Sequence, residues 1–250
     1  MIGNKIFEFD RVDSTNTVAD QIFQQRDPAD GEVVWAHDQY AGRGQHDHTW
    51  VSEPGKNLSF TVILRPRFLP PHRQFMLNKA VALAVADFVA GALQKGPHPP
   101  VSVKWPNDIY VGESKIGGIL IENKIMGSKL DTSLVGIGIN VNQRVFPPEI
   151  PNPTSLVSFL KQETDVREML TWVCRHLESR YAALQEPGKG NLDEAYDSRL
   201  LGFEQWRNYT LQGRISRGKI KGVNLTGQLL IETVTGTTLS FDHGEVGFIL

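Results

Sequence analysis

A glycine-rich stretch at residues 41–50, AGRGQHDHTW, has a spacing suited to holding an anion. Gly42 and Gly44 let backbone N–H groups approach a ligand closely, and Arg43 between them presents a fixed fork of donors. Gln39, just upstream, adds a neutral donor and acceptor. The stretch therefore predicts a cradle for a carboxylate or a phosphate, although the same residues taken alone favour an exposed turn.

A second candidate is KWPNDIY, residues 104–110, at the end of a predicted strand. Pro106 fixes its own φ and keeps Trp105 extended, which holds Asn107 and Asp108 in a set direction. A carboxylate in that place can bind Mg²⁺ or accept a proton. The competing interpretation is an ordinary turn, because Pro-Asn-Asp is common turn chemistry.

A third candidate, KIGGILIE at residues 115–122, places Lys115 at the start of a strand that continues with Gly117 and Gly118. Glycine inside a strand often marks a ligand that approaches the backbone closely, and a lysine there would meet the ligand's charged end. The alternative is an ordinary surface lysine beside a bulge. GIGIN, residues 136–140, again combines small residues in a buried strand with a polar end, here an asparagine able to read a base edge.

A polar stretch, DSTN at residues 13–16, precedes apolar residues at helical spacing, namely Val18, Ile22 and Phe23. Its aspartate, serine and threonine are good N-cap residues, so the stretch is predicted to lie at a helix N-terminus. Free N–H groups at such an end favour an acceptor or an anion.

The elements that must position these motifs alternate along the chain up to about residue 200. Strand patterns are predicted at residues 5–12, 31–40, 57–66, 101–111, 115–123 and 132–142, and helical patterns at 13–25, 74–94, 165–184 and 192–200. The helix at 74–94 is apolar almost all round and should be buried. From Trp206 onward, short strands separated by Gly, Asn and Asp are typical of a small β-barrel. We therefore predict a mixed α/β domain over residues 1–203 and a small β domain over residues 204–250.

The composition excludes several classes of protein. The 250 residues carry a net charge of −2, so bulk electrostatics recruits neither nucleic acid nor an anionic membrane. We expect no apolar run long enough to cross a bilayer, and the N-terminus lacks the pattern of a signal peptide. The single cysteine, Cys174, excludes an intrachain disulfide and a zinc–thiolate cluster. Together these features predict a cytoplasmic protein.

In this order, the motifs resemble those of the biotin–protein ligases, also called holocarboxylase synthetases. The resemblance spans residue 7 to about residue 200 and rests on DSTN (13–16), Gln39 with GRG (42–44), TW (49–50), KWPND (104–108), KIGGILIE (115–122) and GIGIN (136–140). It implies an α/β (α+β) fold in which a mixed β-sheet forms the catalytic domain and a small SH3-like β-barrel follows. It also implies two steps: biotin and MgATP give biotinyl-5′-adenylate and pyrophosphate, and the biotinyl group then passes to one lysine of an acceptor protein.

The resemblance assigns roles to individual residues. A carboxylate and the α-phosphate of ATP repel each other, and Arg43 and Lys115 are the matching cations that would lower this barrier. Asp108 is the candidate to take the proton of the acceptor lysine. The implied biotin-binding residues are Ser14, Thr15, Asn16, Gln39, Arg43, Gly44, Gln45, Lys115, Gly117 and Gly118. The implied ATP-binding residues are Arg43, His48, Trp50, Lys104, Asn107, Lys115 and Asn140. Mg²⁺ is the implied cofactor of ATP, with no metal ligand assigned.

The implied acceptor is the biotin carboxyl carrier protein or domain of acetyl-CoA carboxylase or a related carboxylase. A strand edge could also pair two subunits as a homodimer. Many ligases of this family carry an N-terminal helix-turn-helix, but the first catalytic strand here begins near Ile6, so no operator binding is expected. The small C-terminal domain carries no cluster of ligand-like residues, and no chemistry is assigned to it. Gln45 stands where a second arginine is common, so weaker retention of the adenylate is expected.

Two other functions fit the sequence less well. A lipoate or octanoate ligase or transferase takes an apolar tail with no ureido head, and Gln39 and DSTN argue against it. A biotin-binding regulator without catalysis is disfavoured by the presence of Arg43, Lys115 and Asp108. His46 and His48 are two residues apart and could begin a metal site, but two histidines are too few to close one. A polar lid is favoured there, with His48 helping at a phosphate.

Overall fold

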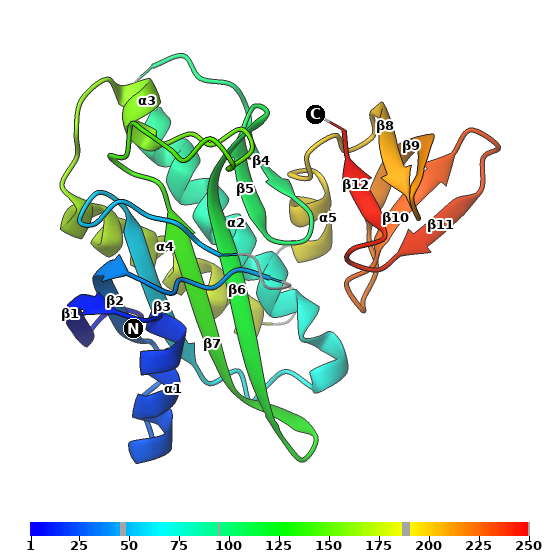
Figure 1. The fold of residues 1–250 in the computed structure, drawn as a ribbon. Helices are drawn as coiled ribbons and strands as arrows, with labels where there is room; N and C mark the ends of the chain where they lie inside the picture. The colour runs from blue at the N-terminus through cyan, green and yellow to red at the C-terminus, as the bar shows by residue number, and fades with distance from the viewer. Residues whose placement is uncertain (46–48, 95, 187–190, 250) are drawn as a thin grey trace.

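The computed structural model describes residues 1–45, 49–94, 96–186 and 191–249. Its larger part is built on a seven-stranded sheet with the order β1-β2-β3-β7-β6-β5-β4 (Figure 1). The strands are β1 (Ile6–Val12), β2 (Glu32–Gln39), β3 (Leu58–Leu64), β4 (Val101–Lys104), β5 (Asp108–Val111), β6 (Ser114–Met126) and β7 (Lys129–Ile139). β1 and β2 are parallel, and the other neighbouring pairs are antiparallel. The predicted mixed sheet is therefore confirmed.

Helices cover both faces of this sheet (Figure 1). They are α1 (Thr15–Gln25), α2 (Phe75–Leu93), α3 (Leu156–Leu160), α4 (Val166–Gln185), α5 (Leu192–Asp197) and the 3-10 turn η1 (Pro71–Arg73). Successive residues of a strand point to opposite faces, and β2 illustrates this. Val33 and Trp35 belong to the main core with α2 and α4, whereas Val34 packs with Ala19 of α1. The N-terminus of α1 is thereby fixed against the sheet.

The buried helix α2 corrects one expectation. Among the described residues, one helical segment, Pro71–Leu93, is long and apolar enough by length and composition to cross a bilayer. The expectation that no apolar run reaches this length was therefore wrong. However, 72% of the qualifying window is buried inside the protein, where α2 packs against α4 and α5. The burial predicted for residues 74–94 is therefore confirmed, because α2 lies in the core of the protein.

The C-terminal part forms a separate antiparallel sheet with the order β11-β10-β9-β8-β12 (Figure 1). Its strands are β8 (Trp206–Leu211), β9 (Arg214–Val223), β10 (Leu229–Thr233), β11 (Thr238–Phe241) and β12 (Val246–Phe248). The all-β character predicted from Trp206 onward is confirmed. The domain boundary predicted at residues 203 and 204 falls between α5 and β8 and stays a prediction.

An aromatic corner and a buried lysine help to anchor the small sheet to the larger part of the protein. The indole nitrogen of Trp105 donates a hydrogen bond of 2.9 Å to the carbonyl oxygen of Gly227. A Cβ at Gly227 would lie 2.5 Å from the ring of Phe75, so glycine lets this ring press on the backbone. Lys79, buried in α2, donates to Asp193 at 2.7 Å and to the carbonyl of Val223 at 3.1 Å. These contacts set the small sheet beside the predicted KWPND stretch.

Two features of the larger part of the protein differ from the sequence expectation. The run predicted at residues 101–111 is two antiparallel strands, β4 and β5, joined by a turn with a cis Trp105–Pro106 peptide bond. Lys104 is paired directly with Asp108 across this turn. The short helix α3 was not predicted. The other predicted strands and helices are present.

Candidate active site

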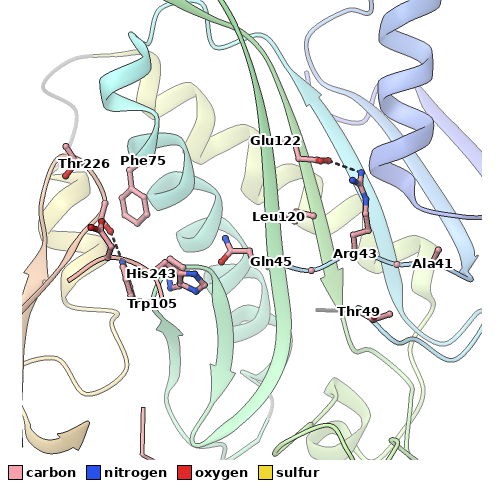
Figure 2. A pocket seen from close by; sticks show the side chains of 15 residues that line it. Ala41, Arg43, Gln45, Thr49, Phe75, Trp105, Leu120, Glu122, Thr226 and His243 are labelled. Carbon is pink, nitrogen blue, oxygen red and sulfur yellow. Dashed lines mark hydrogen bonds and ion pairs between the residues drawn. The ribbon is translucent and has the colours of Figure 1, made fainter. Parts of the chain in front are cut away.

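Two adjoining cavities lie between the loop after β2, the face of β6 and the small sheet. The inner cavity has a volume of about 240 Å³, and the outer one about 790 Å³. Both are lined by Arg43, Gly44, Gln45, Thr49, Leu120 and His243. Figure 2 shows the outer cavity with Arg43 and Glu122 on one side and Phe75, Trp105 and Thr226 on the other. The shared lining indicates one continuous site with a narrow inner end.

Most of the predicted site residues line the inner cavity. They are Ser14, Thr15, Asn16, Gln39, Arg43, Gly44, Gln45, Trp50, Asn107, Asp108, Lys115 and Gly118. These residues come from the start of α1, the end of β2, the following loop, the start of β5 and the start of β6. Segments up to about a hundred positions apart in the chain therefore meet at one cavity. His48, predicted at a phosphate, lies outside the described residues.

The start of α1 supplies a buried polar cluster to this cavity. The backbone N–H of Thr15 donates to Gln39 Oε1 at 2.8 Å, and the Thr15 hydroxyl donates to the same atom at 3.1 Å. The Thr61 hydroxyl donates to Asn16 Oδ1 at 2.6 Å. Ser14 is the N-cap residue, but its side chain makes no capping hydrogen bond. The cluster presents neutral donors and acceptors, which suits a neutral polar head group rather than a hydrocarbon tail.

Two glycines of β7 make room for this cluster and for an aromatic wall. A Cβ at Gly136 would lie 2.5 Å from Asn16 Oδ1, and one at Gly138 would lie 2.3 Å from Cε2 of Trp50. Both glycines line the inner cavity. The sequence showed small residues in a buried strand, but not that they seat Asn16 and Trp50. Gly136 and Gly138 are therefore cavity-lining positions to which the sequence alone assigned no individual role.

We expect Gly138→Ala to lower the free energy of unfolding by about 1 to 3 kcal/mol, because the added methyl group forces the Trp50 ring to move in a packed site. The same displacement should raise the KM for ATP if Trp50 lies near the nucleotide. Urea unfolding followed by tryptophan fluorescence measures the first effect. Gly96→Ala is the control, since a Cβ there meets nothing within 4 Å. Equal unfolding free energies for the two variants would contradict the expectation.

A cation and a carboxylate face each other at the mouth of β6. Lys115 Nζ lies 2.6 Å from Asp108 Oδ1, and the two side chains are 30% and 25% exposed. Gly118 is paired with Asp108 across the strands, and a Cβ there would lie 3.4 Å from Asp108 Oδ1. The glycine therefore leaves the charged pair open to the cavity. This pair offers both a cation for developing negative charge and a base for a proton.

Arg43 forms a second charged contact on the opposite wall. Its Nη2 lies 3.2 Å from Glu122 Oε2 (Figure 2). The same carboxylate oxygen accepts a hydrogen bond of 2.6 Å from Asn16 Nδ2. Glu122 belongs to the quoted stretch KIGGILIE, but the sequence reasoning gave it no role. Arg43 and Lys115 thus approach the inner cavity from different segments. Their convergence is the arrangement that a reaction between two anions requires.

The two glycines of the loop have different roles. A Cβ at Gly42 would lie 2.5 Å from the carbonyl oxygen of Trp50, whose N–H donates to the Gly42 carbonyl at 2.9 Å. Arg43 and Thr49 form an isolated antiparallel bridge next to this contact. Gly42 therefore closes the loop on itself and also lines the outer cavity, whereas Gly44 lines both cavities. The prediction that both glycines admit a ligand to the backbone stays a prediction.

Three predicted residues do not reach either cavity lining. A Cβ at Gly117 would lie 2.8 Å from the carbonyl oxygen of Gly138, so strand packing alone requires a glycine at this position. Asn140 turns its amide to the carbonyl of Thr154 at 2.9 Å. Lys104 Nζ lies 3.4 Å from the Tyr110 hydroxyl, and burial lowers the pKa of Lys104 against the opposing effect of Asp108. Asn107 lines the cavity, but its amide donates to the carbonyl of Ile119.

The small C-terminal domain contributes residues to the lining of the outer cavity, although its sequence shows no cluster of ligand-like residues. Thr226, Gly227, Asp242 and His243 line that cavity. His243 also lines the inner one, and its ring lies 5.7 Å from that of Trp105. These residues lie in turns between short strands. They reach the cavity because Trp105 and Phe75 hold the small sheet against the larger part. The local sequence spacing does not predict this contact.

Comparison with known proteins gives a consistent result. The model of the biotin/lipoate A/B protein ligase family matches residues 8–140. The bifunctional ligase/repressor BirA of Bacillus spizizenii is 31% identical over 94% of this chain and 72% of its own length. The biotin–[acetyl-CoA-carboxylase] ligase of Paracoccus denitrificans is 27% identical over 90% of this chain and 93% of its own.

Solved structures agree with the family match. The biotin protein ligase of Aquifex aeolicus in complex with biotin and ATP superposes with a TM-score of 0.78 and 27% identity, over 98% of each chain. The mixed sheet followed by a separate C-terminal sheet is thus the architecture of a biotin protein ligase. The chain therefore belongs to the biotin/lipoate A/B protein ligase family and is a ligase of its biotin–protein ligase branch.

Proposed function

We propose that this ligase activates biotin with ATP as biotinyl-5′-adenylate and transfers the biotinyl group to one lysine of a biotin carboxyl carrier domain. The observation that supports the proposal most is the convergence of Arg43, Lys115 and Asp108 on one cavity beside a neutral polar cluster. The Aquifex aeolicus relative was solved with biotin and ATP, and the Paracoccus denitrificans relative is named for acetyl-CoA carboxylase.

In the first step, a biotin carboxylate oxygen forms a bond to the α-phosphorus of ATP. The bond from that phosphorus to the bridging oxygen breaks, and pyrophosphate leaves with the electron pair. Arg43 and Lys115 are the cations that reduce the repulsion between the two anions. The cluster of Ser14, Thr15 and Gln39 orients the ureido head, whose N–H and C=O groups need both acceptors and donors.

In the second step, the acceptor amine attacks the acyl carbon of the adenylate, and AMP leaves. The ammonium form of lysine has no lone pair, so it must first lose a proton. Asp108 is the proposed receiver of that proton, since it faces the cavity at the mouth of β6. A lipoyl or octanoyl tail would leave the polar cluster unpaired, which costs binding free energy.

Mg²⁺ belongs to the proposed reaction as the partner of ATP. Within the described ranges, no group of three or more His, Cys, Asp or Glu residues is placed to hold a metal ion. A Mg²⁺ bound with ATP would be held mainly by phosphate oxygens and water, with few protein ligands. We also propose a cytoplasmic location. Homodimer formation and the lack of operator binding stay predictions.

The proposed function is tested by pyrophosphate exchange. The protein is incubated with MgATP and labelled pyrophosphate, and biotin, lipoate or octanoate is added separately. Label should enter ATP when biotin is added, but not when lipoate or octanoate is added. The reason is that only a reversible adenylation step returns pyrophosphate to ATP. Exchange driven by lipoate or octanoate would reassign the substrate. No exchange with any of the acids would refute the activity.

The loop residue Gln45 carries a prediction about retention of the intermediate. Gln45 lines both cavities, and an arginine there could make a charge-assisted two-pronged contact with phosphate. We expect Gln45→Arg to slow adenylate dissociation about tenfold. The dissociation rate is measured from pH 6 to 8, with Gln24→Arg on the exposed face of α1 as a charge-matched control. Identical rates would show that residue 45 does not contact the intermediate.

A further inference from the structure

Glu122 is a charged cavity residue to which the proposed reaction gives no role. It lies on β6 two residues beyond Leu120, so both face the outer cavity by strand alternation. A carboxylate at this place repels the phosphates that the site must admit. Its presence beside the cation of the loop therefore needs a physical reason.

The contacts of Glu122 join two parts of the site. Its Oε2 lies 3.2 Å from Arg43 Nη2 and 2.6 Å from Asn16 Nδ2. Figure 2 shows Arg43 extended towards Glu122 across the wall of the cavity. One carboxylate oxygen thus holds both the cation of the glycine loop and an amide of the polar cluster.

The contacts of Glu122 with Asn16 and with Arg43 differ in how easily another group can replace them. Asn16 is 3% exposed, accepts from the Thr61 hydroxyl at 2.6 Å and packs on Gly136. Arg43 is 48% exposed, and its partner Glu122 is 39% exposed. An ion pair as open as this contributes little and is readily replaced by a better anion. The amide side of the contact is therefore fixed, and the arginine side is exchangeable.

We propose that Glu122 is a positioning residue that holds Arg43 beside the polar cluster until the phosphate of the adenylate takes its place. The inference rests on the proposed function. In this arrangement the hydrogen bond to Asn16 supports the biotin head, whereas the negative charge competes with the bound anion for Arg43. The two effects act on different ligands, so they can be separated by substitution.

Glu122→Gln removes the charge and keeps an acceptor oxygen for Asn16. Glu122→Ala removes both. Binding is measured by calorimetry with three probes: biotin, a non-hydrolysable phosphodiester analogue of biotinyl-adenylate, and a matching analogue with an uncharged linker. The control is Glu163→Gln, which removes the carboxylate of another exposed ion pair, 3.0 Å from Lys56 and outside both cavities.

Glu122→Gln should bind the charged analogue about fivefold tighter, the size of an exposed ion pair. Its affinity for biotin and for the uncharged analogue should stay within about twofold of wild type. Glu122→Ala should weaken biotin binding about three- to tenfold through the loss of a hydrogen bond. A role in folding alone would change all three probes together.

Unchanged or weaker binding of the charged analogue by Glu122→Gln would overturn the inference, as would an equal gain for both analogues. An equal gain in Glu163→Gln would attribute the effect to net charge and overturn it as well. Wild-type protein that binds no biotin would remove the proposed function together with this inference. Normal wild-type binding with an unresponsive Glu122→Gln would remove the inference alone.

Discussion

Lys115→Ala is expected to reduce adenylate formation by about two to three powers of ten while leaving the fold nearly intact. Lys115 Nζ lies 2.6 Å from Asp108 Oδ1 and faces the inner cavity. A fixed cation aimed at the charge that develops in the transition state contributes several kcal/mol, of order 3 kcal/mol for one contact. The partly exposed ion pair itself contributes about 1 kcal/mol or less to stability.

The matched control is a lysine on the same strand. Lys124 of β6 pairs with Asp20, and these side chains are 35% and 32% exposed, against 30% and 25% for Lys115 and Asp108. Lys124→Ala should therefore lose a similar amount of stability and retain pyrophosphate exchange. Exchange rates and urea unfolding are measured for both variants. Near-normal exchange in Lys115→Ala would refute its assignment, and an equal loss in both variants would point to a shared folding defect.

The sequence predicts the sheet and its helices well because their buried residues form long apolar runs. The run at 57–66 and the mostly apolar helix at 74–94 leave little choice of element. The run at 101–111 was less certain for a physical reason. An extended segment broken by Pro106 has the same local pattern whether it continues or turns back on itself. Only the pairing of β4 with β5 decides between the two.

The charged and polar residues of the site can be predicted from their types and positions. The groups that approach the glycines cannot be predicted from the sequence. A glycine inside a strand indicates that some group approaches the backbone closely, but it does not indicate which group. Gly117 and Gly138 lie on neighbouring strands, yet the first meets a backbone oxygen and the second meets the Trp50 ring. Glu122 was missed because an acid next to an arginine is visible only after the loop and β6 are brought together.

The wall formed by the small domain was also beyond sequence reasoning. Thr226 and His243 have no neighbours in sequence that suggest a ligand. They reach the cavity because Trp105 and Phe75 fix the turn at Gly227. Such residues depend on how two sheets dock, which is a property of distant apolar contacts and not of local pattern.

Asp108→Asn is expected to separate the two half-reactions. Asparagine keeps the size of the side chain and an oxygen that accepts from Lys115, so the cation stays in place and adenylate formation should fall only a few-fold. Transfer to the carrier lysine should fall by about two powers of ten or more, because a positioned general base contributes roughly 10²- to 10⁴-fold. Transfer is measured in a single turnover from preformed adenylate.

The transfer rate of the wild type and that of Asp108→Asn should also depend differently on pH. In the wild type the carboxylate receives the proton inside the complex, so the transfer rate should change little from pH 6 to 9. In the variant the acceptor must lose its proton to the solvent first. An ordinary lysine pKa is about 10.4, so its neutral fraction rises about tenfold for each pH unit over this range. The variant's rate should rise equally steeply, and the gap to wild type should narrow as the pH increases.

Asp20→Asn is the matched control, because Asp20 is the partner of Lys124 and lies outside both cavities. It should leave both half-reactions and their pH profiles unchanged. A flat profile in Asp108→Asn with slow transfer would indicate that the carboxylate positions the acceptor without taking its proton. Equal losses in both half-reactions would instead assign Asp108 to holding Lys115, because the neutral amide binds the ammonium group less strongly than the carboxylate does.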